Sequence, residues 1–413
     1  VNFNANGSSS FGEDSRWATF WSVGAGWNIS NEEFFIEYVP FIQWLKVKGS
    51  YGVSGNMGFS PEDAMAVYTL DTENDYMSRF GAYLKAFGNS TLKWQNTYQL
   101  NLGVELHTWN RRLQFEFSYY DKLTNNTVAE MLLPISHGFG TAKANSGSIR
   151  NKGWDAKVTV NLFHNPNRGF TWSVTGSFNH TKNLIEKISE GYKKFLKELN
   201  SSMYTADVYY RYREGYSMDA IYGLRTVGVA PATGQRMFLT KDEDVTFAQN
   251  AEDMVYLGDR LPKINGNLST NLAYKGFILT VGFGVKWGGK QFNSTLANKT
   301  ENAYLILNQD RRVLSDTWQK PGDIVPYKKL MLNSASTNTF PCDAFVQKDN
   351  VFQCTNINVS YNFSDQFCRK LGLKGLSLGA NLSDVFYIST VKRERGTSYP
   401  FSRNPIFFLS LSF

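Results

Sequence analysis

The stretch FILTVGFGVKW, residues 277–287, carries a large apolar side chain at every odd-numbered position. From Thr280 onward, the even-numbered positions hold only small or polar residues and end with Lys286. A period of two places these two sets on opposite faces of a β-strand. The 11 residues also match the length of a strand that crosses a bilayer at a tilt, whereas an ordinary strand has about 5 to 6. This stretch therefore predicts a membrane-spanning β-strand.

The same alternation recurs along the whole chain. The C-terminal stretch FFLSLSF places Phe407, Leu409, Leu411 and Phe413 on one face, with serines between the last three. Further alternating segments lie at residues 21–29, 45–54, 99–107, 113–119, 157–162, 172–179, 267–274, 356–363 and 376–382. With a short strand at residues 1–4, we count about 13 or 14 strands, a number within the range of outer-membrane barrels.

A soluble sandwich with one wet face shows the same alternation, so the connections decide between the two folds. Short turns are predicted at residues 109–111, 164–169, 231–234 and 274–276. Long loops are predicted near residues 55–94, 124–147, 181–218, 241–262, 289–344 and 389–403. Short turns on the periplasmic side and long extracellular loops are typical of bacterial outer-membrane proteins. The chain is therefore predicted to be all-β, a transmembrane antiparallel β-barrel that forms a single domain over residues 1–413.

Two segments depart from the period of two. Asn31–Leu45 has a helical pattern and lies on the short-turn side. Leu184–Leu199 lies in an outer loop and carries one apolar helical face. That face consists of Ile185, Ile188, Tyr192, Phe195, Leu196 and Leu199. We expect a surface helix that packs on its own loop, with a lid or a partner contact as the alternative.

The composition agrees with a barrel. The mean hydropathy is −0.35, and no apolar run approaches the roughly 18 residues of a transmembrane helix. Aromatic residues make up 15% of the chain, which suits aromatic girdles at both membrane interfaces. The net charge of +7 is scattered rather than clustered, which favours loop charge over nucleic-acid binding. The three cysteines, Cys342, Cys354 and Cys368, allow one disulfide at most and make no metal set.

No motif for catalysis, metal binding or cofactor binding is present in the sequence. The four histidines have no metal-binding spacing, so we expect no enzyme, no metal and no cofactor. Loop aromatics are the only substrate-binding candidates, because such rings stack on sugars and their hydroxyls bind peptide groups. They are Tyr209, Tyr210, Tyr212, Trp318 and Tyr327. Packing within the loops or anchoring at the interface is the alternative for each of them.

Several stretches resemble the C-terminal part of the SusC-like (SusC/RagA) TonB-dependent transporters of the Bacteroidetes outer membrane. They include RWATFWSVGAGWNIS at residues 16–30, LKVKGSYGVSGN at residues 45–56, LKWQ at residues 92–95 and the terminal Phe413. The order and spacing of these motifs cover nearly the whole chain. Gln353–Asn356, QCTN, departs from the family pattern R-L-K-N, so a cation expected in the lumen is missing there.

The resemblance implies a barrel of about 22 strands, of which residues 1–413 would be the C-terminal part. The plug domain, the TonB-contacting segment and the early strands would lie outside these residues. The implied function is TonB-dependent import of oligosaccharides or peptides across the outer membrane. The implied partners are a SusD-like surface lipoprotein, the TonB complex, outer-membrane lipid and a glycan or peptide substrate, and two copies can pair as a dimer.

Two other functions fit the pattern of the residues without the resemblance. A passive porin-like barrel complete in itself would conduct ions steadily through a planar bilayer. A secreted all-β binding protein or adhesin would stay soluble without detergent and would carry no belt of lipid-facing aromatic residues.

Overall fold

The structure is a computed structural model of the 413 residues. It describes residues 1–11, 15–76, 79–86, 88–132, 141–165, 169–202, 212–331, 338–392, 394 and 402–413.

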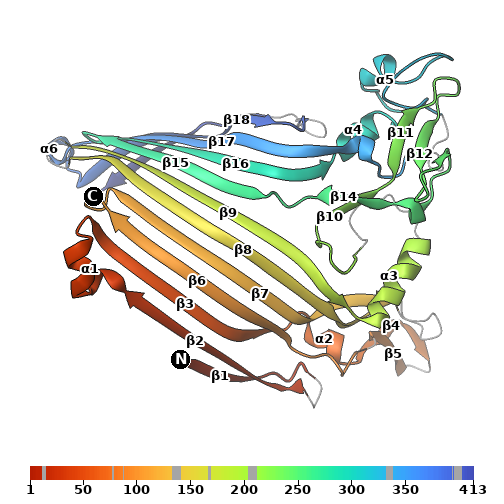
Figure 1. Ribbon diagram of the computed structural model, residues 1–413, viewed down its shortest axis with the longest axis horizontal. Helices are drawn as coiled ribbons and strands as arrows, with labels where there is room; N and C mark the ends of the chain where they lie inside the picture. The colour runs from red at the N-terminus through yellow and green to blue at the C-terminus, as the bar shows by residue number, and fades with distance from the viewer. Residues whose placement is uncertain are drawn as a thin grey trace.

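One antiparallel sheet of 12 strands dominates the fold (Figure 1). Its strands, in the order in which they pair, are β1 (Asn2–Gly7), β2 (Trp17–Asn28), β3 (Ile42–Asn56), β6 (Gln95–Thr108), β7 (Leu113–Leu132), β8 (Thr141–Asn165), β9 (Phe170–Ile188), β15 (Ile264–Tyr274), β16 (Phe277–Phe292), β17 (Val346–Asn362), β18 (Gly375–Ser389) and β19 (Ile406–Ser412). Apart from the two edge strands, each strand of this sheet pairs with the one before it and the one after it in this order. This meander is the topology of an up-and-down barrel wall.

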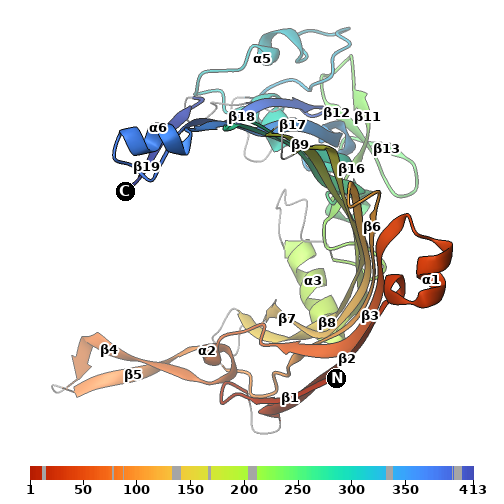
Figure 2. The same cartoon turned by 90° about the vertical axis from the view of Figure 1, so that its left-hand side faces the viewer.

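The sheet curls into an open arc rather than a closed ring (Figure 2). Within the described residues, β1 pairs only with β2, and β19 pairs only with β18. The two outer edges of the arc therefore present backbone N–H and C=O groups that no other strand in this sheet satisfies. In hydrocarbon each such group costs several kcal/mol, so these edges need a partner.

The register of the strands confirms the predicted alternation. Leu279 on β16 lies opposite Leu272 on β15 and Val359 on β17, so apolar residues form rows across neighbouring strands. Many of these side chains are exposed, for example Leu102 at 48% and Leu409 at 61%. An apolar surface of this extent is typical of contact with lipid rather than water.

Thr270 is a polar residue in the apolar rows, and its hydroxyl has a hydrogen-bond partner. The hydroxyl of Thr270 accepts a hydrogen bond of 2.9 Å from the indole nitrogen of Trp172 on the adjacent strand. A polar group without such a partner is costly in hydrocarbon, and this bond removes the cost.

Tight hairpins join the strands at one end of the arc. Between β15 and β16, Lys275 and Gly276 have φ values of 46° and 90°, which is the left-handed pair of a type I′ turn. A Cβ on Gly276 would lie 2.4 Å from the carbonyl oxygen of Asn362, so only glycine fits. The turn between β6 and β7 uses three consecutive left-handed residues, Trp109 to Arg111.

The predicted short turn at residues 231–234 was placed wrongly. The structure puts it between β11 (Arg225–Val229) and β12 (Arg236–Leu239), in a three-stranded sheet completed by β13 (Val245–Thr246) and separate from the large sheet. These strands lie at the long-loop end of the molecule (Figure 1). The large sheet consequently has 12 strands among the described residues, fewer than the number expected.

Two predicted long loops begin or end as strand. The described residues of 124–147 continue β7 and β8, which pair as far as Leu132 and Thr141, and residues 181–188 continue β9 to Ile188. These extensions rise beyond the apolar rows. The other extracellular connections contain two further two-stranded sheets: β4 (Val67–Tyr76) with β5 (Arg79–Ala86), and β10 (Ala220–Gly223) with β14 (Val255–Asp259).

Both predicted helices exist, but each is shorter than expected. The segment Asn31–Leu45 forms a 3-10 turn at Ile29–Asn31 and helix α1 (Glu33–Tyr38), and Pro40 separates the helix from β3. The segment Leu184–Leu199 starts within β9, and helix α3 (Glu190–Ser202) begins only at Glu190.

The remaining helices are single turns or little more. They are α2 (Pro61–Ala64), α4 (Ser294–Lys299), α5 (Arg312–Ser315), α6 (Asp365–Lys370) and the 3-10 turns Ala251–Asp253 and Asp343–Phe345. Among the residues that the structure describes, no helix combines the length and the apolar character needed to cross a membrane. All three cysteines are free and buried.

The two-faced wall predicts how one strand responds to a charge. Val281→Arg should destabilise the protein by about 2–4 kcal/mol, because its guanidinium would enter the middle of the lipid-facing row. Thr280→Arg is the matched control, since Thr280 is next to Val281 in the sequence but faces the opposite side of the sheet, where its side chain reaches water. Urea unfolding in phospholipid vesicles measures the free energy of unfolding of both variants. Equal losses in the two variants would contradict the assignment of faces.

Candidate transport cavity and extracellular loop core

The concave side of the arc is the polar side. Helix α3 lies within the arc (Figure 2), and its Leu196 packs against Ile185 and Ile188 of β9. Ile185 therefore faces inward, and the residues of the same parity below it on β9 face inward with it. They are Ser173, Thr175, Ser177, Asn179, Thr181 and Asn183. Along β9 the inner surface is thus built from hydroxyl and amide side chains.

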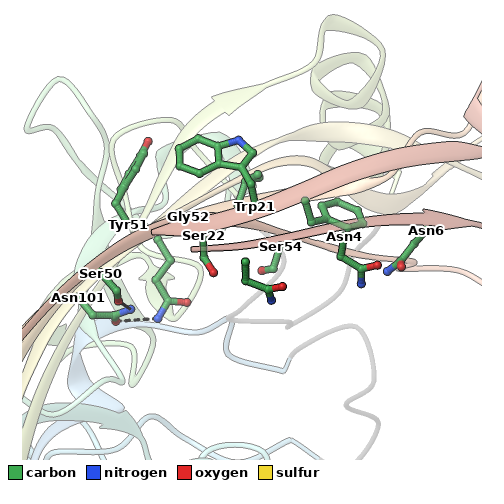
Figure 3. A pocket seen from close by; sticks show the side chains of 14 residues that line it. Asn4, Asn6, Trp21, Ser22, Ser50, Tyr51, Gly52, Ser54 and Asn101 are labelled. Carbon is green, nitrogen blue, oxygen red and sulfur yellow. Dashed lines mark hydrogen bonds between the residues drawn. The ribbon is translucent and has the colours of Figure 1, made fainter. Parts of the chain in front are cut away.

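A cavity of about 370 Å³ lies on this inner surface, over β1, β2, β3 and β6. Figure 3 shows Trp21 and Tyr51 pointing to one side of the sheet, while Ser22 and Asn101 point to the other. Three asparagines of β1, Asn2, Asn4 and Asn6, extend the same polar lining. Their spacing of two residues along one strand places all three on one face.

Hydrogen bonds within a strand and between strands hold this polar lining in place. The amide of Gln99 donates to Asn101 at 2.7 Å, and the amide of Asn101 donates to the Ser50 hydroxyl at 3.2 Å. Farther along the inner face, Tyr120 and Thr181 share a hydrogen bond of 2.6 Å. Each group keeps further donor or acceptor capacity, because an amide or hydroxyl forms more than one hydrogen bond.

Charged pairs on the inner face lie closer to the short-turn end. Lys48 meets Glu105 at 2.6 Å, and Lys157 meets Glu116 at 3.5 Å. Glu105 and Glu116 lie directly opposite each other on β6 and β7, so the two lysines offset a like-charge contact. In a water-filled lumen such pairs contribute little to stability.

The extracellular loops form a compact core of their own at the long-loop end of the wall. Its buried members come from segments far apart in the sequence: Leu224, Phe238, Met254, Leu296, Ala297, Cys342 and Phe345. Backbone hydrogen bonds join two of these segments, since Leu224 donates to Pro341 and Asp343 donates to Leu224. Burial raises the pKa of the Cys342 thiol to about 12, so this cysteine stays protonated and unreactive.

One ion pair is enclosed within this loop core. The guanidinium of Arg236 donates to Glu301 from two nitrogens, at 2.8 and 2.5 Å, and the two side chains are 3% and 0% exposed. Glu301 also accepts hydrogen bonds from the Lys328 backbone amide and the Thr339 hydroxyl. Burial alone lowers the pKa of Arg236, but the hydrogen bonds and charge of Glu301 outweigh burial and leave that pKa raised. Removing either partner would leave the other as a buried charge without a counter-ion.

A second network joins the loop after α4 to the loop before β19. Arg312 contacts Asp310 and Glu394, both at 2.8 Å, and Lys299 contacts the other oxygen of Glu394 at 2.8 Å. Hydrogen bonds from the side chain and the backbone amide of Arg312 hold the pKa of Asp310 well below its usual range. Asp310 therefore stays charged beside Arg312 at neutral pH.

The structure builds Trp318 and Tyr327 into the scaffold of the loop core. The indole of Trp318 donates to the Pro231 carbonyl at 2.8 Å, and its ring covers Gly234. The ring of Tyr327 stacks on Phe345 with 6.1 Å between the ring centres, and burial raises the pKa of this tyrosine. The two residues are neighbours, because the Trp318 amide donates to the Tyr327 carbonyl. Packing explains both positions, and substrate contact by either residue stays a prediction.

Of the tyrosine candidates of the other loop, Tyr212 lies within the described residues. Tyr212 packs, partly buried, against the cluster of Ile185, Ile188 and Leu196 beneath α3. Tyr209 and Tyr210 lie outside the described residues. The predicted packing of the outer-loop helix on its own segment is therefore present, and the structure brings Tyr212 together with neither Trp318 nor Tyr327.

The sequence analysis missed the amides of the inner face as candidates. Asn4 and Asn101 lay in the polar half of alternating segments, and the parity of neighbouring strands was the signal that would have singled them out. In the part of the chain that the structure describes, no three His, Cys, Asp or Glu side chains are grouped so as to hold a metal ion. The arrangement can bind polar ligands by hydrogen bonds.

Comparison with known proteins matches residues 1–383 to the family model of the TonB dependent receptor-like β-barrel. The chain belongs to this family. Its members are outer-membrane proteins, and the apolar rows of the 12-stranded sheet accordingly face lipid of the outer membrane.

Curated relatives place the chain in the SusC-like group of the family. TonB-dependent receptor P39 of Formosa agariphila is 25% identical over 431 residues, which cover 92% of this chain and 40% of the relative. TonB-dependent receptor SusC of Bacteroides thetaiotaomicron is 22% identical over 431 residues, covering 98% of this chain and 41% of SusC. The chain thus spans about two fifths of the length of these relatives.

Solved structures of the family have the same fold. The RagAB peptide importer in its closed-closed state matches 100% of this chain and 45% of its own chain, with a TM-score of 0.81 and 22% identity. A second RagAB structure, described as a peptide transporter, gives a TM-score of 0.79 at 21% identity. The 12 strands described here therefore follow the wall of a larger barrel of this type.

The enclosed ion pair predicts a strong local effect in the loop core. Glu301→Ala should lower the free energy of local unfolding of the loops by about 3–5 kcal/mol, because it leaves the Arg236 guanidinium buried without its partner. Hydrogen exchange of the amides around Phe238 and Phe345 measures this free energy. Glu243→Ala is the control: it breaks the exposed pair with Arg225 and should cost less than about 1 kcal/mol. Similar exchange in the two variants would show that the buried pair does not hold the loops together.

Proposed function

We propose that this chain forms much of the wall and the outer loops of a TonB-dependent importer for oligosaccharides or peptides. The observation that carries the proposal is the cavity on the inner face of the arc over β1, β2, β3 and β6, whose polar lining consists of uncharged amides and hydroxyls such as those of Asn4, Ser50 and Asn101. Asparagine, serine and threonine both donate and accept hydrogen bonds. They therefore suit neutral ligands rich in hydroxyl or peptide groups better than ions.

The open arc supports a larger barrel. Within the described residues, the outer edges of β1 and β19 have no pairing strand, and in this proposal further strands of a larger barrel close the wall in lipid. The relatives are more than twice as long as the part that this chain matches. In this proposal the plug domain and the TonB-contacting segment also belong to the part outside these residues.

The outer loops offer a surface for a SusD-like lipoprotein. Large apolar side chains are exposed on the loop that carries α5, at the long-loop end of Figure 1. They are Tyr304, Ile306, Leu307, Leu314 and Ile324, with Ile324 at 90% exposure. Exposed apolar patches of this kind are typical of protein–protein contacts. A lipoprotein seated here would cover the extracellular mouth of the arc and present substrate to it.

The import proposal predicts that uptake depends on energy delivered from the inner membrane. A strain that relies on this protein should take up a labelled oligosaccharide or peptide, and deletion of TonB should reduce uptake to the background of a strain without the transporter. The physical reason is that an importer with a plug stays closed until TonB displaces the plug. Affinity purification from the same cells should also recover a surface lipoprotein.

The control is a small antibiotic that enters through general porins, because its entry should not change in the TonB deletion strain. Uptake of the labelled nutrient that is equal with and without TonB would contradict active import and would favour a passive channel.

A further inference from the structure

The wall contains a notch between β9 and β16, beyond the end of β15. β9 pairs with β15 from Phe170 to Asn179, and β15 extends no farther toward the long-loop end. β9 continues in that direction to Ile188, and β16, on the other side of β15, continues to Phe292. Within the described residues, these two upper ends do not pair with each other. The segment at Tyr216 hydrogen-bonds to Ile185 of β9, and Leu257 of β14 accepts a hydrogen bond from Lys290 of β16. A crevice of about 900 Å³ lies between these two segments.

The crevice is strongly basic. Its lining includes four lysines and one histidine but a single carboxylate, that of Asp259. The lysines are Lys182, Lys263, Lys290 and Lys348. Lys290 and Lys348 are direct cross-strand neighbours, and like charges in that arrangement repel each other. Asp259 already accepts a hydrogen bond of 3.3 Å from the Tyr256 hydroxyl. An anion in the crevice would relieve the repulsion between the lysines.

The crevice opens at the upper limit of the lipid-facing rows. His180 and Lys182 have the parity opposite to the inward-facing Ile185, so both point outward. His180 packs on Trp154 with 6.2 Å between the ring centres, and Trp287 on the other side of the crevice is 59% exposed. Aromatic rings in this position mark the boundary between hydrocarbon and headgroups. Lys182, at the edge of the crevice, therefore lies at the level of the lipid headgroups on the extracellular side.

Neighbouring charges on the outer surface agree with this position. Arg150 and Lys152 of β8 lie beside the crevice on the same outward face, where they contact Asp121 at 2.7 and 3.2 Å. Charged side chains are tolerated on the outside of a barrel near the interface but not at the middle of the hydrocarbon. The outer surface thus changes from apolar to charged just where the crevice begins.

We propose that this crevice binds the phosphate-bearing headgroup of a lipid in the outer leaflet. The ammonium groups of Lys182, Lys263 and Lys348 would bind the phosphate by charge-assisted hydrogen bonds. The exposed ring of Trp287 and the apolar rows below it would contact the acyl chains of the same molecule. This site differs from the transport cavity in both position and ligand, and it does not depend on the import function.

The test uses the intact protein extracted from outer membranes and placed in phosphatidylcholine nanodiscs. The probes are a monophosphorylated lipid A and the same lipid after enzymatic removal of its phosphate, and native mass spectrometry measures their dissociation constants. The phosphorylated lipid should bind at least about 10-fold more tightly than the dephosphorylated one. The triple variant Lys182→Gln, Lys263→Gln, Lys348→Gln should remove most of that difference. Lys290 is kept, because its ammonium group also joins β16 to β14.

A control variant makes the same change of charge at exposed lysines that do not line the crevice. It is Lys241→Gln, Lys320→Gln, Lys370→Gln, and it should change the dissociation constant by less than about twofold. Heat-modifiable mobility on gels confirms that both variants retain the barrel. Equal weakening in the two variants, or equal binding of the two lipids by the unmodified protein, would overturn the proposal. Binding of inorganic phosphate that the phosphorylated lipid fails to displace would also overturn it, because the ligand would then be a free anion.

Discussion

Backbone hydrogen bonding between neighbouring strands is the interaction on which this structure depends. In hydrocarbon no water is available to satisfy a free N–H or C=O group, so each strand that contacts lipid needs a partner along its whole lipid-exposed length. The large sheet meets this demand between each successive pair from β1 to β19. The tight turn at Lys275 and Gly276 sets the register of one such pair with two left-handed residues. A slip of one residue would turn every apolar side chain toward the lumen.

The two faces of the wall follow from that register, and function follows from the difference between the faces. Alternation places apolar rows outward and amides or hydroxyls inward, where they line the cavity beside Asn101. Toward the long-loop end the strands extend past the apolar rows into water. Water can satisfy backbone groups there, so continuous pairing is no longer required. There β9 and β16 diverge, and loops with their own core and the enclosed pair of Arg236 and Glu301 replace the sheet. The basic crevice lies at this transition, which is the place where charge and lipid meet.

The sequence predicted the parts of the fold that depend on local pattern. The alternating segments, the turn before Phe277 and the antiparallel meander were all predicted correctly, because period and turn chemistry are local properties. The turn at residues 231–234 was assigned to the wall, since a short strand in a loop sheet has the same local pattern as the end of a spanning strand. The loop core was not predicted, because contacts such as that of Leu224 with Pro341 join distant segments. The structure packs Trp318 over Gly234 beside that core, and its contact with substrate stays a prediction. Parity on neighbouring strands would have indicated the inner amides.

The most direct test of the two-faced wall is the accessibility of spin labels on single strands. Labels at Leu102, Phe115 and Val281, on a background with the three native cysteines replaced by alanine, should collide with lipid-soluble oxygen and not with a water-soluble nickel chelate. Labels at Asn101 and Glu116 should show the reverse, because their side chains face the aqueous interior. Oxygen contact at Asn101 and Glu116, with nickel contact at the other three positions, would contradict the account.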